Sequence, residues 1–329
     1  MKAIIQDRYG SPDVLRPAEV DRPEPGDDEV LVRVHAAAVN ARDWHFMRGD
    51  PYLARLMAPG EMRLRRPEAA IRGTDFAGEV TAVGRGVTAF RPGDEVFGEA
   101  AGAFAEYVCA PQDVVDTRPA GLTFEQAAAL PLAANTALVG LRDRGGVRPG
   151  RQVVINGASG GVGTFAVQIA KWLGAEVTAV CSTRNVDLVT SLGADHVIDY
   201  TQDDFTRDRD RYDVVFDLVG NQPLTRLRRT LTQGGTLLLA GGGTSEGGSL
   251  IGPMGLVIRA MLLAPLVRTH RLLTVDARPS RENLATLREL ADAGTLRPVL
   301  DRTYKLAEVP DAIRYMEDEH TRGKVVITM

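Results

Sequence analysis

The chain has 329 residues, of which 44% are hydrophobic and 25% are charged, and its formal net charge is −4. This composition is ordinary for a soluble globular protein, and it argues against a basic nucleic-acid-binding face and a polybasic membrane surface. The length suggests two domains, each large enough to enclose its own hydrophobic core.

Three features bear on the compartment. The chain starts with a strand-like segment, residues 2–5, so we expect no signal or transit segment. The longest apolar run, 251–267, is broken by glycine, proline and arginine, so we expect no stable membrane insertion. Cys109 and Cys181 lie in strand-like runs without a ligand spacing, as expected of small buried thiols. We therefore expect a cytoplasmic protein.

Residues 1–122 alternate short apolar runs with turn signals and predict a β-rich domain. The expected strands are 2–9, 29–37, 75–83, 95–98 and 104–110. The segment 43–72 is polar, rich in arginine and interrupted by glycine and proline, and we interpret it as a surface loop or lid.

From residue 123 to residue 267, strands alternate with helices. Thr123 and Gln126 predict a capping box for a helix over 124–143, kinked at Pro131. The alternation predicts an α/β domain with a doubly wound parallel sheet. Its strands are expected at 152–156, 176–181, 196–199, 213–217 and 236–240, and its helices at 161–173, 185–192 and 222–230.

The remaining segment, 268–329, is expected to return to the first domain and complete it. It carries predicted helices at 281–293 and 309–318 and predicted strands at 299–304 and 324–328. The active site should then lie in a cleft at the carboxyl ends of the parallel strands.

A glycine-rich turn follows the strand 152–156 and opens the next helix. Ala158, Gly160 and Gly163 form a variant of the G-x-G-x-x-G pattern. Glycines permit a tight turn and close backbone approach, while a helix N-terminus offers N–H groups and a positive dipole end to a pyrophosphate. The turn therefore predicts a dinucleotide site.

The tip of the strand 176–181 indicates which dinucleotide is bound. An Asp or Glu usually meets a bare ribose 2′-hydroxyl there, but this strand ends in Ser182, Thr183, Arg184 and Asn185. A charge-assisted hydrogen bond from Arg184 to a 2′-phosphate contributes roughly 1.5–3 kcal/mol. This predicts a preference for NADPH over NADH of about ten- to a hundredfold. The alternative is that Arg184 is only a solvated residue at a helix start.

Segments typical of one family occur along nearly the whole chain: 73–80, 83–84, 90–96, 133–137, the glycine-rich turn, 192–200 and 322–327. On these segments the chain resembles the medium-chain dehydrogenase/reductase superfamily, in its zinc-independent quinone oxidoreductase branch. The resemblance implies a GroES-like β-rich domain into which a Rossmann domain is inserted, and a homodimer.

The resemblance also implies the absence of zinc. Zinc-dependent relatives carry a cysteine at the position of Asn40 and Gly-His-Glu where this chain has Gly73-Thr74-Asp75. The five histidines, at positions 35, 45, 196, 270 and 320, show no metal-ligand spacing. Hydride delivery from NADPH to an already electrophilic small molecule, a quinone or an α,β-unsaturated carbonyl, is therefore expected. A 2-alkenal or enoyl-thioester reductase and a non-catalytic NADPH-binding protein stay as alternatives.

By resemblance, Ser182, Arg184 and Tyr200 surround the 2′-phosphate, with Thr183 or Asn185 adding a hydrogen bond. Alternatively, Tyr200 is a packed aromatic residue. The pyrophosphate is expected at Ser159, Gly160, Gly161, Val162 and Gly163.

At the other end of the cofactor, the resemblance places Asn40 and Thr136 beside the nicotinamide. Gly241 and Val275 would hold the carboxamide, and Gly323 with Lys324 would close over the cofactor, although Lys324 could be only a solvated charge.

The family's tyrosine near the substrate cleft corresponds to Tyr52, which is expected to orient or protonate the acceptor, or only to line the pocket. Tyr52, Asn40 and Thr136 are thus the predicted catalytic residues. The run 251–267 is expected to be either an interface helix or an apolar wall of the acceptor site.

Overall fold

The computed structural model describes residues 1–52, 55, 67, 70–207, 209, 211–240, 254–319 and 321–329. Within these residues the chain forms two compact units. Unit 1 comprises residues 1–135 and 278–329, and unit 2 comprises residues 136–240 and 254–277. The chain therefore leaves unit 1, forms unit 2 and returns. The predicted domain boundaries, after residues 122 and 267, lie earlier in the chain than the divisions between the two units, which fall after residues 135 and 277.

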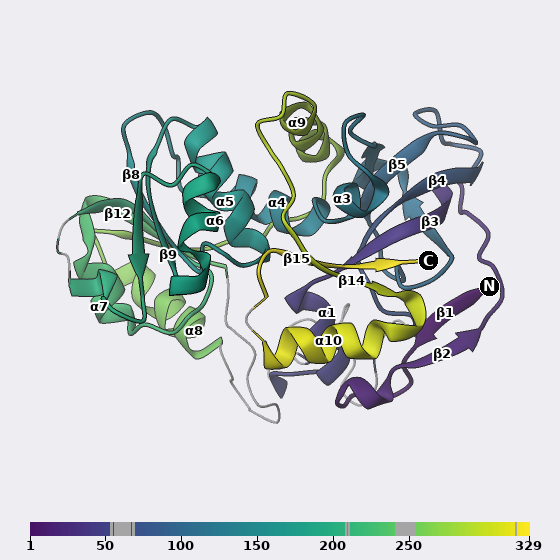
Figure 1. Cartoon of the computed structure of the whole chain (residues 1–329), viewed down its shortest axis with the longest axis horizontal. Helices are drawn as coiled ribbons and strands as arrows, with labels where there is room; N and C mark the ends of the chain where they lie inside the picture. Colours follow the sequence, from purple (N-terminus) through teal and green to yellow (C-terminus); the bar gives the residue numbers. More distant parts are fainter. Residues whose placement is uncertain are drawn as a thin grey trace. The chain divides into compact units, whose positions relative to one another are not determined.

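Unit 1 is built on a sheet that has seven strands among the described residues. The order is β14-β15-β3-β4-β5-β7, and β6 pairs with β3. All neighbours are antiparallel except β14 and β15. A separate antiparallel pair joins β1 and β2 (Figure 1). The strands are β1 (Lys2–Ile5), β2 (Arg16–Glu19), β3 (Glu29–Val39), β4 (Asp75–Val83), β5 (Glu95–Glu99), β6 (Tyr107–Pro111), β7 (Val115–Thr117), β14 (Leu300–Lys305) and β15 (Lys324–Thr328).

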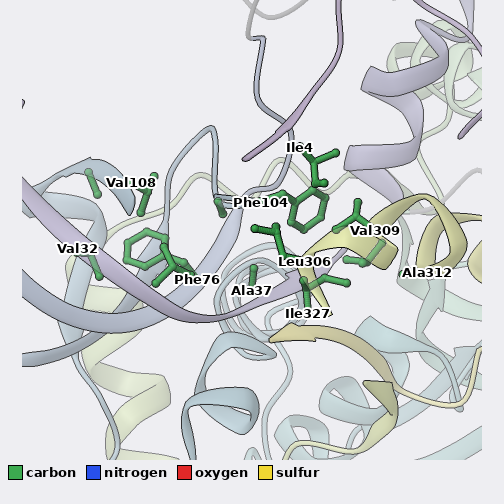
Figure 2. Packing of buried hydrophobic residues seen from close by; sticks show 14 of the residues in the cluster. Ile4, Val32, Ala37, Phe76, Phe104, Val108, Leu306, Val309, Ala312 and Ile327 are labelled. Atoms are coloured by element: carbon green, nitrogen blue, oxygen red, sulfur yellow. The ribbon is translucent and has the colours of Figure 1, made fainter. Parts of the chain in front are cut away.

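The core of unit 1 includes apolar residues of this sheet and of helix α10 (Val309–Asp318). Val309, Ala312 and Ile313 recur at helical spacing and form the buried face of α10. Figure 2 shows α10 residues beside Leu306 and Ile327. Each large apolar side chain that is fully buried contributes about 1.5–3 kcal/mol, which fixes β15 and α10 against the strands.

The predicted loop or lid at 43–72 is wrong at its start, because helix α1 (Ala41–Arg48) occupies this part of the chain. The backbone N–H of Asn40 donates to Asp43 Oδ2 at 2.8 Å, which satisfies a polar group at the helix start. Gly49 ends the helix at a φ of +61°, where glycine is favoured. The rest of the predicted lid lies largely outside the described residues.

The predicted helix 124–143 is divided into three pieces: α3 (Phe124–Ala128), α4 (Pro131–Leu138) and a π-helical segment, Val139–Arg144. The capping box is confirmed, since Thr123 N donates to Gln126 Oε1 at 3.0 Å and Gln126 N donates to Thr123 Oγ1 at 3.3 Å. Pro131 has no N–H to donate, so it opens a new helix where a kink was predicted. Unit 1 also contains α9 (Arg281–Asp292), capped by Ser280.

Unit 2 contains a parallel sheet that has six strands among the described residues, in the order β10-β9-β8-β11-β12-β13. The prediction of a doubly wound parallel sheet is confirmed (Figure 1). Its strands are β8 (Gln152–Asn156), β9 (Glu176–Cys181), β10 (His196–Asp199), β11 (Tyr212–Asp217), β12 (Leu231–Leu239) and β13 (Arg271–Thr274), and its helices are α5 (Gly161–Trp172), α6 (Val186–Ser191), α7 (Leu224–Arg229) and α8 (Met254–Leu263).

Strand β13 is not among the predicted strands, and its segment was assigned to the first domain. It pairs in parallel with β12, from Thr236 opposite Arg271 to Leu239 opposite Thr274. A strand of only four residues carries little periodicity, and only its partner makes it recognisable as part of this sheet.

The apolar run 251–267 is described from residue 254 onward. Ala260 is buried in the core of unit 2, and Leu256 and Val257 pack against that core. Met261, Leu262 and Leu266 are exposed, Leu266 at 78%. Helix α8 thus covers its own sheet with one face, while its end is exposed in unit 2. Among the helices of the described residues, none is both long and apolar enough to cross a membrane.

Candidate functional site

Two glycines of the glycine-rich turn are required by the fold of unit 2. Gly157 follows β8 with a φ of +88°, and a Cβ on it would lie 2.7 Å from Val219 Cγ2. A Cβ on Gly163 would lie 2.1 Å from the carbonyl oxygen of Gly157. Both positions therefore need glycine to let the turn fold back onto the start of α5.

Gly160 is different, because the protein itself leaves room for a side chain there. A Cβ on Gly160 would meet the Gly157 oxygen at 3.5 Å, an ordinary contact. Gly160 is the N-cap of α5, whose first N–H groups lack intrahelical partners and carry the positive end of the helix dipole. The fold of unit 2 therefore does not itself require glycine at 160, and the N–H groups at the start of α5 favour an anion.

A buried polar network fixes the neighbouring strand ends. Asn156 Nδ2 donates to Asp217 Oδ1 at 2.8 Å, and the same oxygen accepts from the backbone N–H groups of Val219 and Gly220 at 3.2 and 3.1 Å. Burial raises the pKa of Asp217, and its Oδ2 atom has no hydrogen-bond partner among the described residues. The loop after β11 is therefore held against the glycine-rich turn by side chains that end β8 and β11.

Asn185 connects the glycine-rich turn to the tip of β9. Its Nδ2 atom donates to Ser159 Oγ at 3.0 Å and to Ser182 Oγ at 3.2 Å. Because both hydroxyl oxygens accept from the amide, both hydroxyl protons can be donated to another group. The structure therefore brings the predicted residues Ser159, Ser182 and Asn185 together.

The tip of β9 also meets a carboxylate that the sequence analysis missed. Thr183 Oγ1 donates to Asp199 Oδ2 at 2.5 Å, and this hydrogen bond is the main reason why the pKa of Asp199 is lowered. Asp199 ends β10 and lies opposite Cys181 in the sheet register. The register of two adjacent parallel strands was the signal that could have placed it there. Arg184 and Tyr200 are both exposed, Tyr200 at 48%.

Three predicted residues of unit 2 lie elsewhere. Thr136 is half-buried in α4. Val275 follows β13, and its N–H donates to Leu239 O at 3.0 Å. Gly241 lies outside the described residues.

Unit 1 contains a buried cluster of polar and charged side chains, centred on Asn40. Asn40 Nδ2 donates to Asp75 Oδ2 at 3.0 Å, and Thr74 Oγ1 donates to Asp43 Oδ1 at 3.1 Å. Asp75 Oδ1 accepts from the backbone N–H of Leu132 at 3.2 Å. We call this set the Asn40 cluster; its members are Asn40, Asp43, Thr74, Asp75, Glu99 and Lys324.

Lys324 is the cation of the Asn40 cluster. Its side chain is only 3% exposed, so it is not a solvated surface charge. Its Nζ atom donates to Val39 O at 3.1 Å and to Asn40 Oδ1, and it lies 3.7 Å from Asp75 Oδ2. The preceding Gly323 has a φ of +86°, and a Cβ there would lie 2.3 Å from Val299 O. The fold of unit 1 itself therefore requires glycine at 323, and this turn leads into the strand that buries Lys324.

Burial shifts the pKa values of the cluster toward neutral forms. It raises the pKa of Asp43 to about 6 and the pKa of Glu99 to about 8, and it also raises the pKa of Asp75. Burial lowers the pKa of Lys324, against the opposing effect of the Asp75 charge. Glu99 lies opposite Asp75 in the sheet, and neither of its carboxyl oxygens has a hydrogen-bond partner among the described residues.

Tyr52 is 44% exposed. It takes part in none of the hydrogen bonds given above for the Asn40 cluster. The guanidinium of Arg55 lies over its ring, 4.6 Å from the ring centroid. The residue follows a cis Asp50–Pro51 peptide bond. Its hydroxyl is thus carried by an exposed ring whose position is supported by a cation–π contact.

Comparisons with known proteins agree with this architecture. Two family models match: an alcohol dehydrogenase GroES-like domain over residues 26–119 and a zinc-binding dehydrogenase over residues 192–327. Quinone-oxidoreductase QR1, a chloroplastic protein of Triphysaria versicolor, is 33% identical, with 99% of this chain and 98% of the relative covered. The chain belongs to the medium-chain dehydrogenase/reductase superfamily, in its quinone oxidoreductase branch. The predicted family is therefore confirmed.

Solved structures show the same relationship for this medium-chain reductase. The quinone oxidoreductase from Coxiella burnetii matches with a TM-score of 0.87 and 31% identity, covering 100% of this chain and 99% of that one. The quinone oxidoreductase from Escherichia coli, solved as a complex with NADPH, matches with a TM-score of 0.84 and 25% identity, and both chains are covered completely. The chain is an oxidoreductase of this type.

The description of one family model as zinc-binding raises the question of whether the Asn40 cluster fits a zinc ion. Zinc prefers thiolate, imidazole and carboxylate ligands in a tetrahedral arrangement. Here an amide, a hydroxyl and a carboxylate stand at positions 40, 74 and 75, and the Lys324 ammonium already binds two of them. Because a fixed cation repels a second cation, this donor set does not fit zinc. Among the described residues, no group of three or more His, Cys, Asp or Glu side chains could hold a metal ion.

Proposed function

We propose that this chain is an NADPH-dependent, zinc-independent reductase that transfers hydride to a quinone. The observation that carries the proposal is the connection between the open glycine-rich turn and the tip of β9 through Asn185. This connection supports the proposal, because it brings the residues expected at the pyrophosphate and those expected at the 2′-phosphate around a single side chain.

The pyrophosphate would be held by the N-terminus of α5. Gly161, Val162 and Gly163 offer backbone N–H groups there, Gly160 lines the approach to them, and Ser159 adds a hydroxyl that can donate outward. Glycine at 160 supports this placement, since the fold alone does not require glycine at that position and close approach of a ligand would.

The 2′-phosphate would lie at Ser182 and Arg184, beside Tyr200. Arg184 is exposed, and Ser182 Oγ accepts from Asn185, which leaves its proton available. Thr183 is less suited to this role, because its hydroxyl donates to Asp199. The negative charge of Asp199 disfavours a phosphate at this position. We therefore expect NADPH to be preferred over NADH by about tenfold, the lower end of the range predicted from the sequence.

The nicotinamide end is proposed to lie beside Asn40 and Thr136, with Gly241 and Val275 at the carboxamide and Gly323 and Lys324 next to the ring. When bound, NADPH supplies the hydride. The protein residues then have to orient the acceptor, exclude water and stabilise the negative charge that hydride transfer leaves on the acceptor oxygen. Tyr52 would orient or protonate that oxygen.

A quinone is favoured as the acceptor because it requires little activation. It is already electrophilic, so no metal Lewis acid is needed to polarise it. The Triphysaria and Coxiella relatives are both named as quinone oxidoreductases, which supports the same acceptor class.

The proposal is tested by anaerobic NADPH oxidation with an ortho-quinone and a medium-chain 2-enone in matched assays. Faster turnover of the quinone would support it. Preference for the enone would move the assignment to alkene reduction, and tight NADPH binding without turnover of either acceptor would favour a binding protein.

A further inference from the structure

The ammonium of Lys324 lies among the polar side chains of the Asn40 cluster. The family resemblance implies that Asn40 corresponds to a cysteine of zinc-dependent relatives, and that Thr74-Asp75 corresponds to their His-Glu. Lys324 Nζ donates to Asn40 Oδ1 and lies 3.7 Å from Asp75 Oδ2, while Asp43 accepts from both Asn40 N and Thr74 Oγ1. A fixed organic cation thus lies in contact with two of these positions, Asn40 and Asp75.

Stability alone does not account for this arrangement. Lys324 and Asp75 are both almost fully buried, and a buried ion pair is often no more stabilising than well-packed apolar residues. Two further carboxyl groups, Asp43 and Glu99, are also buried nearby, and Arg42 acts on Asp75 and Glu99 as a second positive charge. A charged group retained in such surroundings calls for a functional reason.

We propose that Lys324 supplies the fixed positive charge that zinc supplies in the metal-dependent relatives, and that it acts through the amide of Asn40. This inference rests on the proposed function, in which hydride reaches an acceptor beside Asn40. Lys324 is therefore a positioning residue, since it acts on the acceptor through another side chain.

The amide of Asn40 has its two ends fixed by opposite charges. Its oxygen accepts from the Lys324 ammonium, and its Nδ2 atom donates to the Asp75 carboxylate at 3.0 Å. The second Nδ2 hydrogen has only a long contact, 3.4 Å, to Ala38 O. A cation bound to an amide oxygen strengthens the amide N–H groups as donors. This second N–H can therefore serve the acceptor.

In the proposed hydride transfer, electrons and protons are conserved while Lys324 stays protonated. Hydride transfer moves two electrons and one proton from NADPH to the quinone, which leaves one negative charge on an acceptor oxygen. That oxygen takes its proton from solvent or from Tyr52. The ammonium keeps its three protons and lowers the energy of the negative charge as it develops.

The test compares Lys324→Met with the double variant Lys324→Met/Asp75→Asn. The single variant leaves Asp75 as a buried carboxylate without its cation, so it loses both stability and turnover. The double variant removes both charges and should recover most of the wild-type Tm, while kcat with the ortho-quinone stays about a hundredfold down. Lys171→Met is the matched control, because Lys171 forms a 2.8 Å ion pair with Asp195 in unit 2; its kcat should equal that of the wild type.

Three readouts decide the outcome: Tm, kcat at saturating NADPH and the Kd of NADPH from protein fluorescence. Recovery of both Tm and kcat by the double variant would overturn the inference, because the pair would then be only structural. A loss confined to the Kd of NADPH, with kcat unchanged, would also overturn it and make Lys324 a ground-state cofactor ligand. Absence of turnover by the wild-type protein would contradict the proposed function itself, and this inference with it.

Discussion

The side-chain amide of Asn185 donates to the hydroxyl of Ser159 across 3.0 Å, and this bond joins the tip of β9 to the glycine-rich turn after β8. The same amide nitrogen donates to Ser182 Oγ. Asn185 is buried, and its Oδ1 atom has no hydrogen-bond partner among the described residues. Two strand ends that are proposed to bind different parts of a dinucleotide are thus held by one side chain.

Replacing Asn185 by alanine should weaken NADPH binding by about tenfold, which is the loss of one hydrogen-bonding group, about 1.4 kcal/mol. Both serine hydroxyls would then be free to rotate away from the phosphates. Isothermal titration calorimetry with NADPH measures the effect. An unchanged Kd in a folded variant would show that Asn185 does not organise the cofactor site.

Arg184→Ala should weaken NADPH binding by about tenfold and leave NADH binding nearly unchanged, because only NADPH carries the 2′-phosphate. The two Kd values can be measured by the same titration. Arg207→Ala is a suitable control, since Arg207 is an exposed arginine of unit 2 that pairs with Asp203. Equal losses for NADPH and NADH would refute the assignment of Arg184.

Tyr52→Phe should lower kcat by about a hundredfold if the hydroxyl protonates the acceptor, since general acid catalysis contributes typically that much. The phenyl ring keeps the contact with Arg55, so folding should not change. Steady-state kinetics with the ortho-quinone measures kcat and KM separately. Full turnover by the variant would remove Tyr52 from proton transfer.

Glu99 makes the stability of unit 1 depend on pH. Burial raises its pKa from 4.5 to about 8, so the native state holds a proton that the unfolded state releases between these pH values. The native state therefore binds more protons, and the free energy of unfolding falls with rising pH by up to about 1.4 kcal/mol per unit in this window. Below pH 4.5 this contribution to stability is fully present, and above pH 8 it is lost.

Glu99→Gln should remove this dependence and be more stable than the wild type at pH 8, by about 4 kcal/mol. Urea denaturation at pH 6, 7 and 8 gives the free energies of unfolding. Asp43 and Asp75 titrate in both proteins, so the difference between the two proteins reports Glu99 together with its interaction with the Asp75 charge. If the free energy of unfolding of Glu99→Gln depended on pH as that of the wild type does, Glu99 would not be the buried carboxyl that causes this dependence.

The parts of the fold that could be predicted from the sequence are those with local signals. The strand β8, the glycine-rich turn and α5 follow one another in the chain, and Thr123 and Gln126 lie within one helical turn. Helix α1 had such a signal in Asn40 and Asp43, but the surrounding arginines and prolines made the segment resemble a loop. The four residues of β13 gave no comparable pattern.

The Asn40 cluster could not be predicted because its members meet only through the fold. Lys324 and Asn40 are 284 positions apart in the chain. The burial of Glu99 and Asp75 depends on the register between β4 and β5, in which the two lie opposite one another. Likewise, Asp199 reaches Thr183 only because β10 and β9 are neighbours. No local pattern reports such pairings.

The central claim is tested most directly by a single turnover without oxygen. The protein, loaded with one equivalent of NADPH, is mixed with an ortho-quinone, and the absorbance of the reduced nicotinamide is followed together with that of the quinone. The account predicts that both signals disappear with the same rate constant and in equal amounts, as required by direct hydride transfer. Persistence of the nicotinamide signal in the presence of excess quinone would contradict it.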